Sequence, residues 1–272
     1  MRDIIESAIV PGIQLAHIYR QSENAMISLN AKKIKSGDTS ICDGDDFHFV
    51  ETSSLEDIKN AMAAKYVEYV NMYGASQVFC LCPYNNYTAG VKDMNRTLQA
   101  LINPAGYEKK EVRAMGMIFR EGDSVMHIRV NTDKAVNGDV GQIAYIEYTD
   151  NDEETYEVHV VMNDRDLVYT KANIMNLTLA YAMSVYKSQG AEAKAVVTCL
   201  TMAHSAMLFM NIPYVAITRG SEDVTFFGER KALDNAVTVG TGRRRITLLR
   251  RRLLEEAGEY VEVGSVKQRK VI

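Results

Sequence analysis

The sequence has no tryptophan, four prolines and four cysteines, and it has no apolar run long enough to cross a bilayer. The cysteines, at positions 42, 80, 82 and 199, show neither metal-ligand spacing nor the density of a disulfide scaffold. Cys80 and Cys82 alternate within an apolar run, which predicts two small buried side chains on one face of a strand. The N-terminus also lacks the apolar core of a signal peptide. We therefore expect a cytoplasmic protein without a membrane partner.

Size and charge set further bounds on the protein. The chain has 272 residues, of which 47% are hydrophobic and 24% charged, enough to bury a sizeable core. A net charge of −4 excludes a globally basic nucleic-acid binder, although local grooves can still hold DNA. The strongly basic stretch, Arg243–Arg245 with Arg250–Arg252, predicts a solvated amphipathic helix. Docking of DNA or a partner there is the alternative.

Helix and strand patterns alternate up to about residue 104, and this alternation predicts an α/β fold with a parallel sheet. Capping residues support the helix limits: Ser54 begins one helix, and Gly37 and Gly74 follow the ends of two. The expected elements are a helix over 22–34, a strand over 47–50, a helix over 54–73 and a buried strand over 77–82.

The pattern changes between residues 106 and 166, where short strands separated by turns predict a small antiparallel β-barrel inserted into the α/β domain. Turn residues lie at 121–123, 137–139 and 150–152. Four tyrosines in the strands do not define a stacking platform, so a barrel without a ligand is the default. His127 and His159 are expected in the core or facing solvent. The expected strands cover 117–119, 124–130, 141–148, 156–162 and 167–170.

The α/β pattern resumes after Asn173, which indicates one domain completed by two chain segments. The expected elements are helices over 177–188, 204–218 and 229–237 and strands over 195–200 and 224–227. The expected organisation is a first α/β segment (1–105), the barrel (106–166), a second α/β segment (167–240) and a basic C-terminal helix and tail (241–272).

Three separated segments, Ile18–Gln21 with Ala31, Tyr181–Glu192 and Tyr214–Gly220, resemble the fourth, fifth and sixth motifs of RecD-like superfamily 1 DNA helicases. Three further segments also resemble this family: Pro83–Pro104, Phe119–Met126 and Asn137–Gly141. The resemblance covers residues 13 to 250 and extends to the α subunit of exodeoxyribonuclease V. It implies the second RecA-like motor domain of a P-loop NTPase-type helicase, with a small Src-homology-like barrel inserted.

The resemblance also assigns roles at an ATP cleft. Arg219 resembles the arginine finger, for which a permanently charged, fork-shaped guanidinium is suited. From the residues alone, a solvated arginine at a helix C-terminus is the first interpretation of Arg219, and the resemblance places the arginine finger above it. Arg20 resembles a second γ-phosphate sensor, which Gln21 positions. Residues approaching the sugar and phosphates of the nucleotide are Gln189, Gly190 and Glu192, for which a glycine helix cap with solvated neighbours is the alternative.

A different set is expected to contact single-stranded DNA: Ser184, Tyr186 and Lys187, together with Pro83 and Asn86 after a central strand. The family usually has threonine and histidine where this chain has Ser184 and Tyr186. Serine keeps the hydroxyl group, whereas tyrosine changes reach and charge, so Tyr186 is equally suited to stacking on a base. A simple surface loop is the alternative for Pro83 and Asn86.

No G-x-x-x-x-G-K-[ST] segment occurs in the sequence, so a loop that cradles phosphate and supplies a Mg²⁺-binding hydroxyl is missing. We therefore expect a C-terminal part of a helicase that hydrolyses no ATP alone and binds ATP and Mg²⁺ only together with an N-terminal RecA-like motor half. Two other hypotheses remain open: a non-catalytic module that binds single-stranded DNA or protein, and the helicase region of a conjugative relaxase.

Overall fold

The computed structural model describes residues 2–13, 25–129, 131, 135–149, 155–240, 247–258, 260–263 and 266–269. The chain forms two units, one of residues 20–240 and one of residues 1–19 with 241–272. Arg20, Gln21 and Arg243–Arg245 lie outside the described residues. None of the described helices is both long and apolar enough to span a membrane.

The described residues of the smaller unit form two helices and a hairpin. Helix α1 (Arg2–Ser7) packs against helix α7 (Leu249–Glu256), and strands β13 (Tyr260–Val263) and β14 (Val266–Arg269) pair antiparallel. Helix α7 contains Arg250–Arg252, so the described half of the basic stretch is helical as expected. Leu254 of this helix is buried, whereas Leu249 is exposed.

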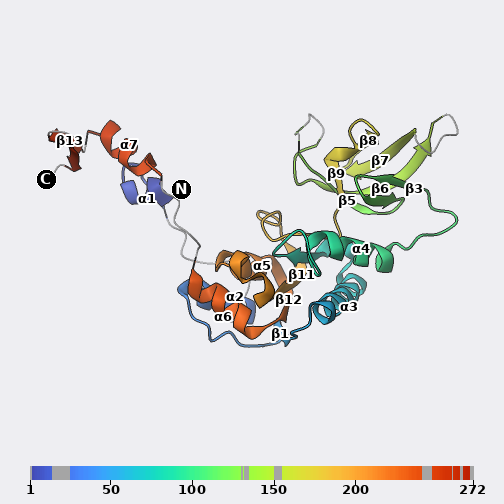
Figure 1. Ribbon diagram of the computed structural model, residues 1–272, viewed down its shortest axis with the longest axis horizontal. Helices are drawn as coiled ribbons and strands as arrows, with labels where there is room; N and C mark the ends of the chain where they lie inside the picture. The colour runs from blue at the N-terminus through green and yellow to red at the C-terminus, as the bar shows by residue number, and fades with distance from the viewer. Residues whose placement is uncertain are drawn as a thin grey trace. The chain divides into compact units, whose positions relative to one another are not determined.

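A five-stranded parallel sheet organises the larger unit (Figure 1). Its order is β1 (Phe47–Glu51), β12 (Gly220–Gly228), β11 (Ala193–Leu200), β2 (Val78–Cys82) and β10 (Ala182–Ser184). One face packs against α2 (Met26–Ser36), α5 (Asn211–Ile217) and α6 (Arg230–Val239), and the other against α3 (Leu55–Tyr73) and α4 (Val91–Ile102). The expected α/β class, a RecA-like parallel sheet with flanking helices, is confirmed.

Local signals place several elements as expected. The Ser54 side chain accepts a hydrogen bond from the backbone N–H of Asp57 at 3.4 Å and begins α3. Helix α2 ends at Gly37, whose φ of 81° is the left-handed conformation that glycine adopts at low cost. Cys80 and Cys82 are buried in the same apolar cluster as α3, as their alternation predicted.

The insert forms two antiparallel sheets. Strands β3 (Glu111–Ala114) and β4 (Met117–Arg120) make a hairpin. The second sheet has the order β8 (Arg165–Thr170), β7 (Tyr156–Met162), β6 (Val140–Tyr148), β5 (Ser124–His127) and β9 (Leu177–Leu179). His127 lies in the core, where its Nδ1 is 2.8 Å from the Tyr169 hydroxyl. His159 is partly buried and stacks on Tyr145, with ring centroids 4.1 Å apart.

The structure corrects two expected helices, of which the first is wrong and the second is divided. Residues 177–188 form the strands β9 and β10 followed by turns, because β9 pairs with β5 and β10 pairs with β2. Residues 204–218 are divided between the 3₁₀ helix η3 (Met202–Met207) and α5. Pro213 explains this division, since proline fits the first turn of a helix but clashes with the carbonyl four residues earlier. Two further 3₁₀ turns are η1 (Ala75–Gln77) and η2 (Ile174–Asn176).

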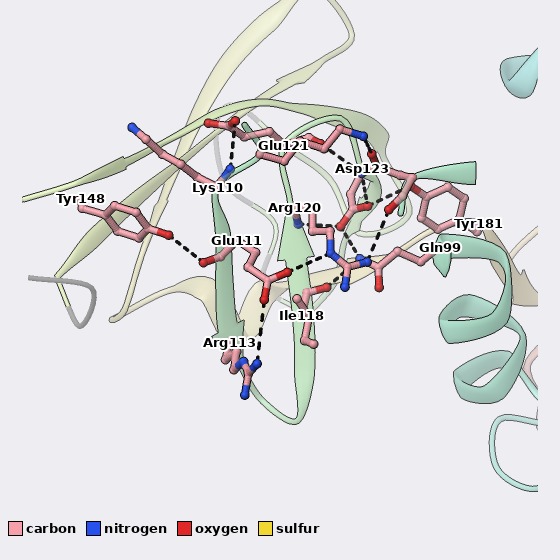
Figure 2. Close-up of polar contacts among 12 residues, drawn as sticks. Gln99, Lys110, Glu111, Arg113, Ile118, Arg120, Glu121, Asp123, Tyr148 and Tyr181 are labelled. Carbon is pink, nitrogen blue, oxygen red and sulfur yellow. Dashed lines mark hydrogen bonds and ion pairs between the residues drawn. The ribbon is translucent and has the colours of Figure 1, made fainter. Parts of the chain in front are cut away.

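A buried carboxylate, Asp123, joins the insert to the α/β part (Figure 2). Its Oδ2 accepts from Gln99 Nε2 at 2.6 Å and from the backbone N–H of Arg120 at 2.7 Å. Its Oδ1 accepts from Asn103 Nδ2 at 2.7 Å and from the Tyr181 hydroxyl at 2.9 Å. Burial and the Asp123 charge both raise the pKa of Tyr181, which therefore stays a donor. The carboxylate is thus satisfied by donors from α4, the insert and the segment before β10.

Replacing Asp123 with alanine should lower the free energy of unfolding by about 3 kcal/mol, because the buried donors of Gln99, Asn103 and Tyr181 would lose their shared acceptor. Urea denaturation measures this loss. Asp166→Ala is the control, because Asp166 is an exposed carboxylate on β8 of the same insert and should cost less than about 0.5 kcal/mol. Equal losses in the two variants would contradict the role given to Asp123.

Candidate nucleic-acid interface

The carboxyl ends of β2 and β10 lie side by side at one edge of the parallel sheet, since Ser184 pairs in register with Cys82. Strand β10 has only three residues and is the outermost strand of the sheet, with β2 as its single neighbour. Asn95 of α4 supplies hydrogen bonds to this strand: its Nδ2 donates to the carbonyl of Ala182 at 2.8 Å, and its Oδ1 accepts from the Ala182 N–H at 3.0 Å. A helix side chain therefore fixes the strand that carries Ser184.

A cavity of about 280 Å³ opens at this edge. Asn86 from the loop after β2, Ser184 from the end of β10 and Lys187 from the following turn all line it. Lys92 of α4 and Met126 of β5 complete the charged and apolar parts of its wall. The structure therefore brings together three of the five residues that the sequence assigned to DNA contact.

Lys187 is an exposed residue whose ammonium group is only partly desolvated. Its Nζ lies 3.6 Å from the Sδ of Met126, and burial lowers the pKa of its ammonium group. A charge in such surroundings interacts more strongly with an incoming anion than one in bulk water does. The cavity thus combines the positive charges of Lys92 and Lys187 with hydroxyl and amide groups that donate hydrogen bonds.

A second hollow, of about 690 Å³, adjoins the first and shares Lys92 with it. Arg96 of α4 and Arg129 after β5 add two cations to its lining. Sequence reasoning missed these three basic residues. The spacing of Lys92 and Arg96, four residues apart, places them on one face of α4 and was a usable signal. Arg129 had no local signal, because the approach of the insert to α4 brings it to the hollow.

Pro83 and Tyr186 do not line either hollow. Pro83 is buried directly after β2 and shapes the start of the loop. Tyr186 is 47% exposed, and its hydroxyl accepts a hydrogen bond from Asn211 Nδ2 at 3.2 Å. These two side chains are therefore not part of the cavity lining that Asn86, Ser184 and Lys187 share.

The residues assigned to the nucleotide form a second group at the opposite edge of the sheet. Gln189, Gly190 and Glu192 are exposed in the turns that precede β11, and Gly190 has a φ of 94°. Arg219 precedes β12, and its Nη1 donates to the carbonyl of Ala191 at 2.8 Å. The expectation that these residues close a helix is wrong. They lie at the amino ends of β11 and β12, because the chain returns across the sheet in turns after β10.

The Arg219 side chain is held within its own domain. Its Nε donates to the carbonyl of Val215 at 3.3 Å and its Nη2 to the hydroxyl of Thr218 at 3.2 Å. Arg219 follows α5 directly, as the sequence predicted. The guanidinium thus contacts the turn that carries Glu192. The segments Tyr181–Glu192 and Tyr214–Gly220, which resemble two helicase motifs, therefore meet in the structure.

Two parts of the chain match known helicase domains. Residues 94–161 match the SH3 domain of ATP-dependent RecD-like DNA helicases, and residues 179–226 match the UvrD-like helicase C-terminal domain. The ATP-dependent RecD2 DNA helicase of Deinococcus radiodurans is 28% identical over 244 residues, which are 89% of this chain and 32% of that protein. The chain thus spans about a third of the length of this relative.

Solved structures of Pif1 helicases show weaker similarity. The enzyme from Candida albicans is 16% identical, with 90% of this chain and 60% of that chain covered and a TM-score of 0.48. The Bacteroides enzyme in complex with ADP-AlF3 and ssDNA is 14% identical, with 90% and 57% covered and a TM-score of 0.47.

The two domain matches define a helicase-derived protein. Together with the RecD2 relative, they confirm the resemblance to RecD-like superfamily 1 helicases.

Proposed function

We propose that this chain is the second RecA-like motor region of an ATP-dependent DNA helicase and that it binds single-stranded DNA at the carboxyl edge of its parallel sheet. The observation that carries the proposal is the cavity shared by Asn86, Ser184 and Lys187. These residues come from three separate chain positions, and their side chains offer amide, hydroxyl and ammonium donors. Such donors suit phosphodiester oxygens and bind without regard to sequence.

The adjoining hollow suits the continuation of the strand. Lys92, Arg96 and Arg129 line it, and each can neutralise a phosphate and release a counterion. Met115 and Met117 of the β3–β4 hairpin supply an apolar side to the same hollow. A groove with cations and adaptable apolar side chains fits a nucleic acid whose bases are unpaired.

The opposite edge of the sheet supports a role toward ATP. Arg219, beside the turn that carries Gln189, Gly190 and Glu192, would stabilise charge on the γ-phosphate, with Arg20 and Gln21 as the second sensor. The phosphate loop and the groups that hold Mg²⁺ would come from an N-terminal RecA-like half. The chain by itself would therefore bind DNA and hydrolyse no ATP.

Titration of the chain with a fluorescent single-stranded oligonucleotide at several salt concentrations, beside an ATPase assay, tests the proposed function. Lys187→Ala should weaken binding to oligonucleotides of any sequence and reduce the slope of log affinity against log salt by about 1. Lys194→Ala is the matched control, because Lys194 is an exposed cation at the amino end of β11. Absence of salt-sensitive binding, or ATP turnover by the pure chain, would contradict the proposal.

The lowered pKa of Lys187 gives a separate prediction. Burial favours the neutral amine, whereas a bound phosphate favours the ammonium form, so DNA binding should take up a proton. Affinity should therefore fall as pH rises through the lowered pKa. Lys187→Arg should bind with little pH dependence between about pH 7 and 10, because the guanidinium stays charged. The same pH profile in wild type and Lys187→Arg would show that Lys187 does not carry the effect.

A further inference from the structure

The loop between β2 and α4 carries an aromatic residue in a strained conformation. Tyr87 has a φ of 76°, in the left-handed region that residues other than glycine rarely adopt. It follows Asn85 and Asn86, which line the first cavity, and its side chain is 69% exposed. A bulky aromatic residue is thus held in a costly backbone conformation with its ring largely in solvent.

Close packing fixes this loop in place. The carbonyl of Tyr87 accepts from the N–H of Gly90 at 3.1 Å, and the carbonyl of Asn85 accepts from the N–H of Lys92 at 3.1 Å. Gly90 lies so near the carbonyl of Asn86 that an added Cβ would collide with it. The surrounding structure therefore determines the backbone of Tyr87, and strain maintained in this way is concentrated at functional sites.

Two further aromatic rings support Tyr87. His204, in η3 after β11, stacks on the buried ring of Tyr84 with centroids 3.9 Å apart and an interplanar angle of 25°. The centroid of the His204 ring also lies 5.1 Å from the centroid of the Tyr87 ring. Burial lowers the pKa of His204, which favours the neutral imidazole. The cluster is therefore an uncharged aromatic series that runs from the core to one exposed ring.

The cluster lies at the carboxyl ends of β2 and β11, and the cavity lies at the carboxyl ends of β2 and β10. Because β2 is the neighbour of both other strands, the two features adjoin along one edge of the sheet. A single strand whose phosphates contact Lys187 and Asn86 would bring a base to Tyr87. Aromatic side chains bind unpaired bases of any sequence, because every base has a π face.

We propose that Tyr87 is a binding residue for an unpaired nucleobase, which stacks on its ring next to the cavity that holds the phosphates. This inference rests on the proposed function and adds to it a base contact that is independent of charge. The strain at Tyr87 is then the cost of presenting an aromatic ring where glycine would fit without strain.

Binding of the whole chain to a single-stranded oligonucleotide, at fixed salt and across a salt series, tests the inference. Tyr87→Leu should weaken binding roughly 5- to 150-fold, the range expected for loss of one stacked base, without changing the salt slope. Tyr87→Phe should keep the wild-type affinity. Tyr87→Gly should weaken binding as Tyr87→Leu does while raising the midpoint of thermal unfolding, because it relieves the strain.

An oligonucleotide of abasic sites supplies the second measurement. Wild type should bind it more weakly than the normal oligonucleotide, whereas Tyr87→Leu should bind it as well as wild type does. Salt-sensitive wild-type binding with equal affinities for wild type and Tyr87→Leu would overturn the stacking role and leave the proposed function standing. Absence of any wild-type binding would overturn both, and a changed salt slope in Tyr87→Leu would show that its effect is not stacking.

Discussion

The buried carboxylate of Asp123 is the constraint on which the larger unit depends. A charge removed from water is tolerated only when donors surround it, and here they come from α4, the insert and the segment before β10. These hydrogen bonds hold the insert against α4 (Figure 2). Since α4 also carries Lys92 and Arg96, the same bonds set one wall of the proposed DNA groove opposite Arg129.

The short strand β10 connects the two edges of the sheet to which functions are assigned. Its last residue, Ser184, lines the cavity at the carboxyl edge. Eight residues later, Glu192 reaches the amino end of β11, beside the carbonyl that Arg219 binds. The segment that resembles one helicase motif therefore divides in space, with its first half at the proposed DNA side and its second half at the proposed nucleotide side. Asn95 fixes the strand between these halves through the main chain of Ala182.

In the proposed function, charge and aromatic stacking have separate roles along the carboxyl edge. Lys187 and the basic residues of α4 would provide attraction that salt screens, whereas the aromatic cluster of Tyr84, His204 and Tyr87 would offer contact that salt hardly affects. The proposed role of Tyr87 would set function against stability, because its backbone conformation is stable for glycine and costly for tyrosine.

The sequence by itself determined the features that depend on neighbouring residues: the cap at Ser54, the end of α2 at Gly37 and the buried face of Cys80 and Cys82. Helix α3 and strand β2 were correct within one residue, and the α/β class followed from their alternation. The resemblance to helicase motifs also identified Arg219 as a candidate nucleotide-site residue and Lys187 as a candidate DNA-contacting residue. Each of these inferences needed only chain positions a few residues apart.

The tertiary structure decided the conformation of residues 177–188 and the composition of the groove. Strands β9 and β10 are extended because β5 and β2, more than 40 residues away in the chain, offer them hydrogen-bonding partners, and no local pattern records such pairing. The groove likewise joins α4, the insert and β10, whose approach is set by the buried contacts of Asp123. Long-range pairing and burial therefore overrode local helix preference where the candidate site lies.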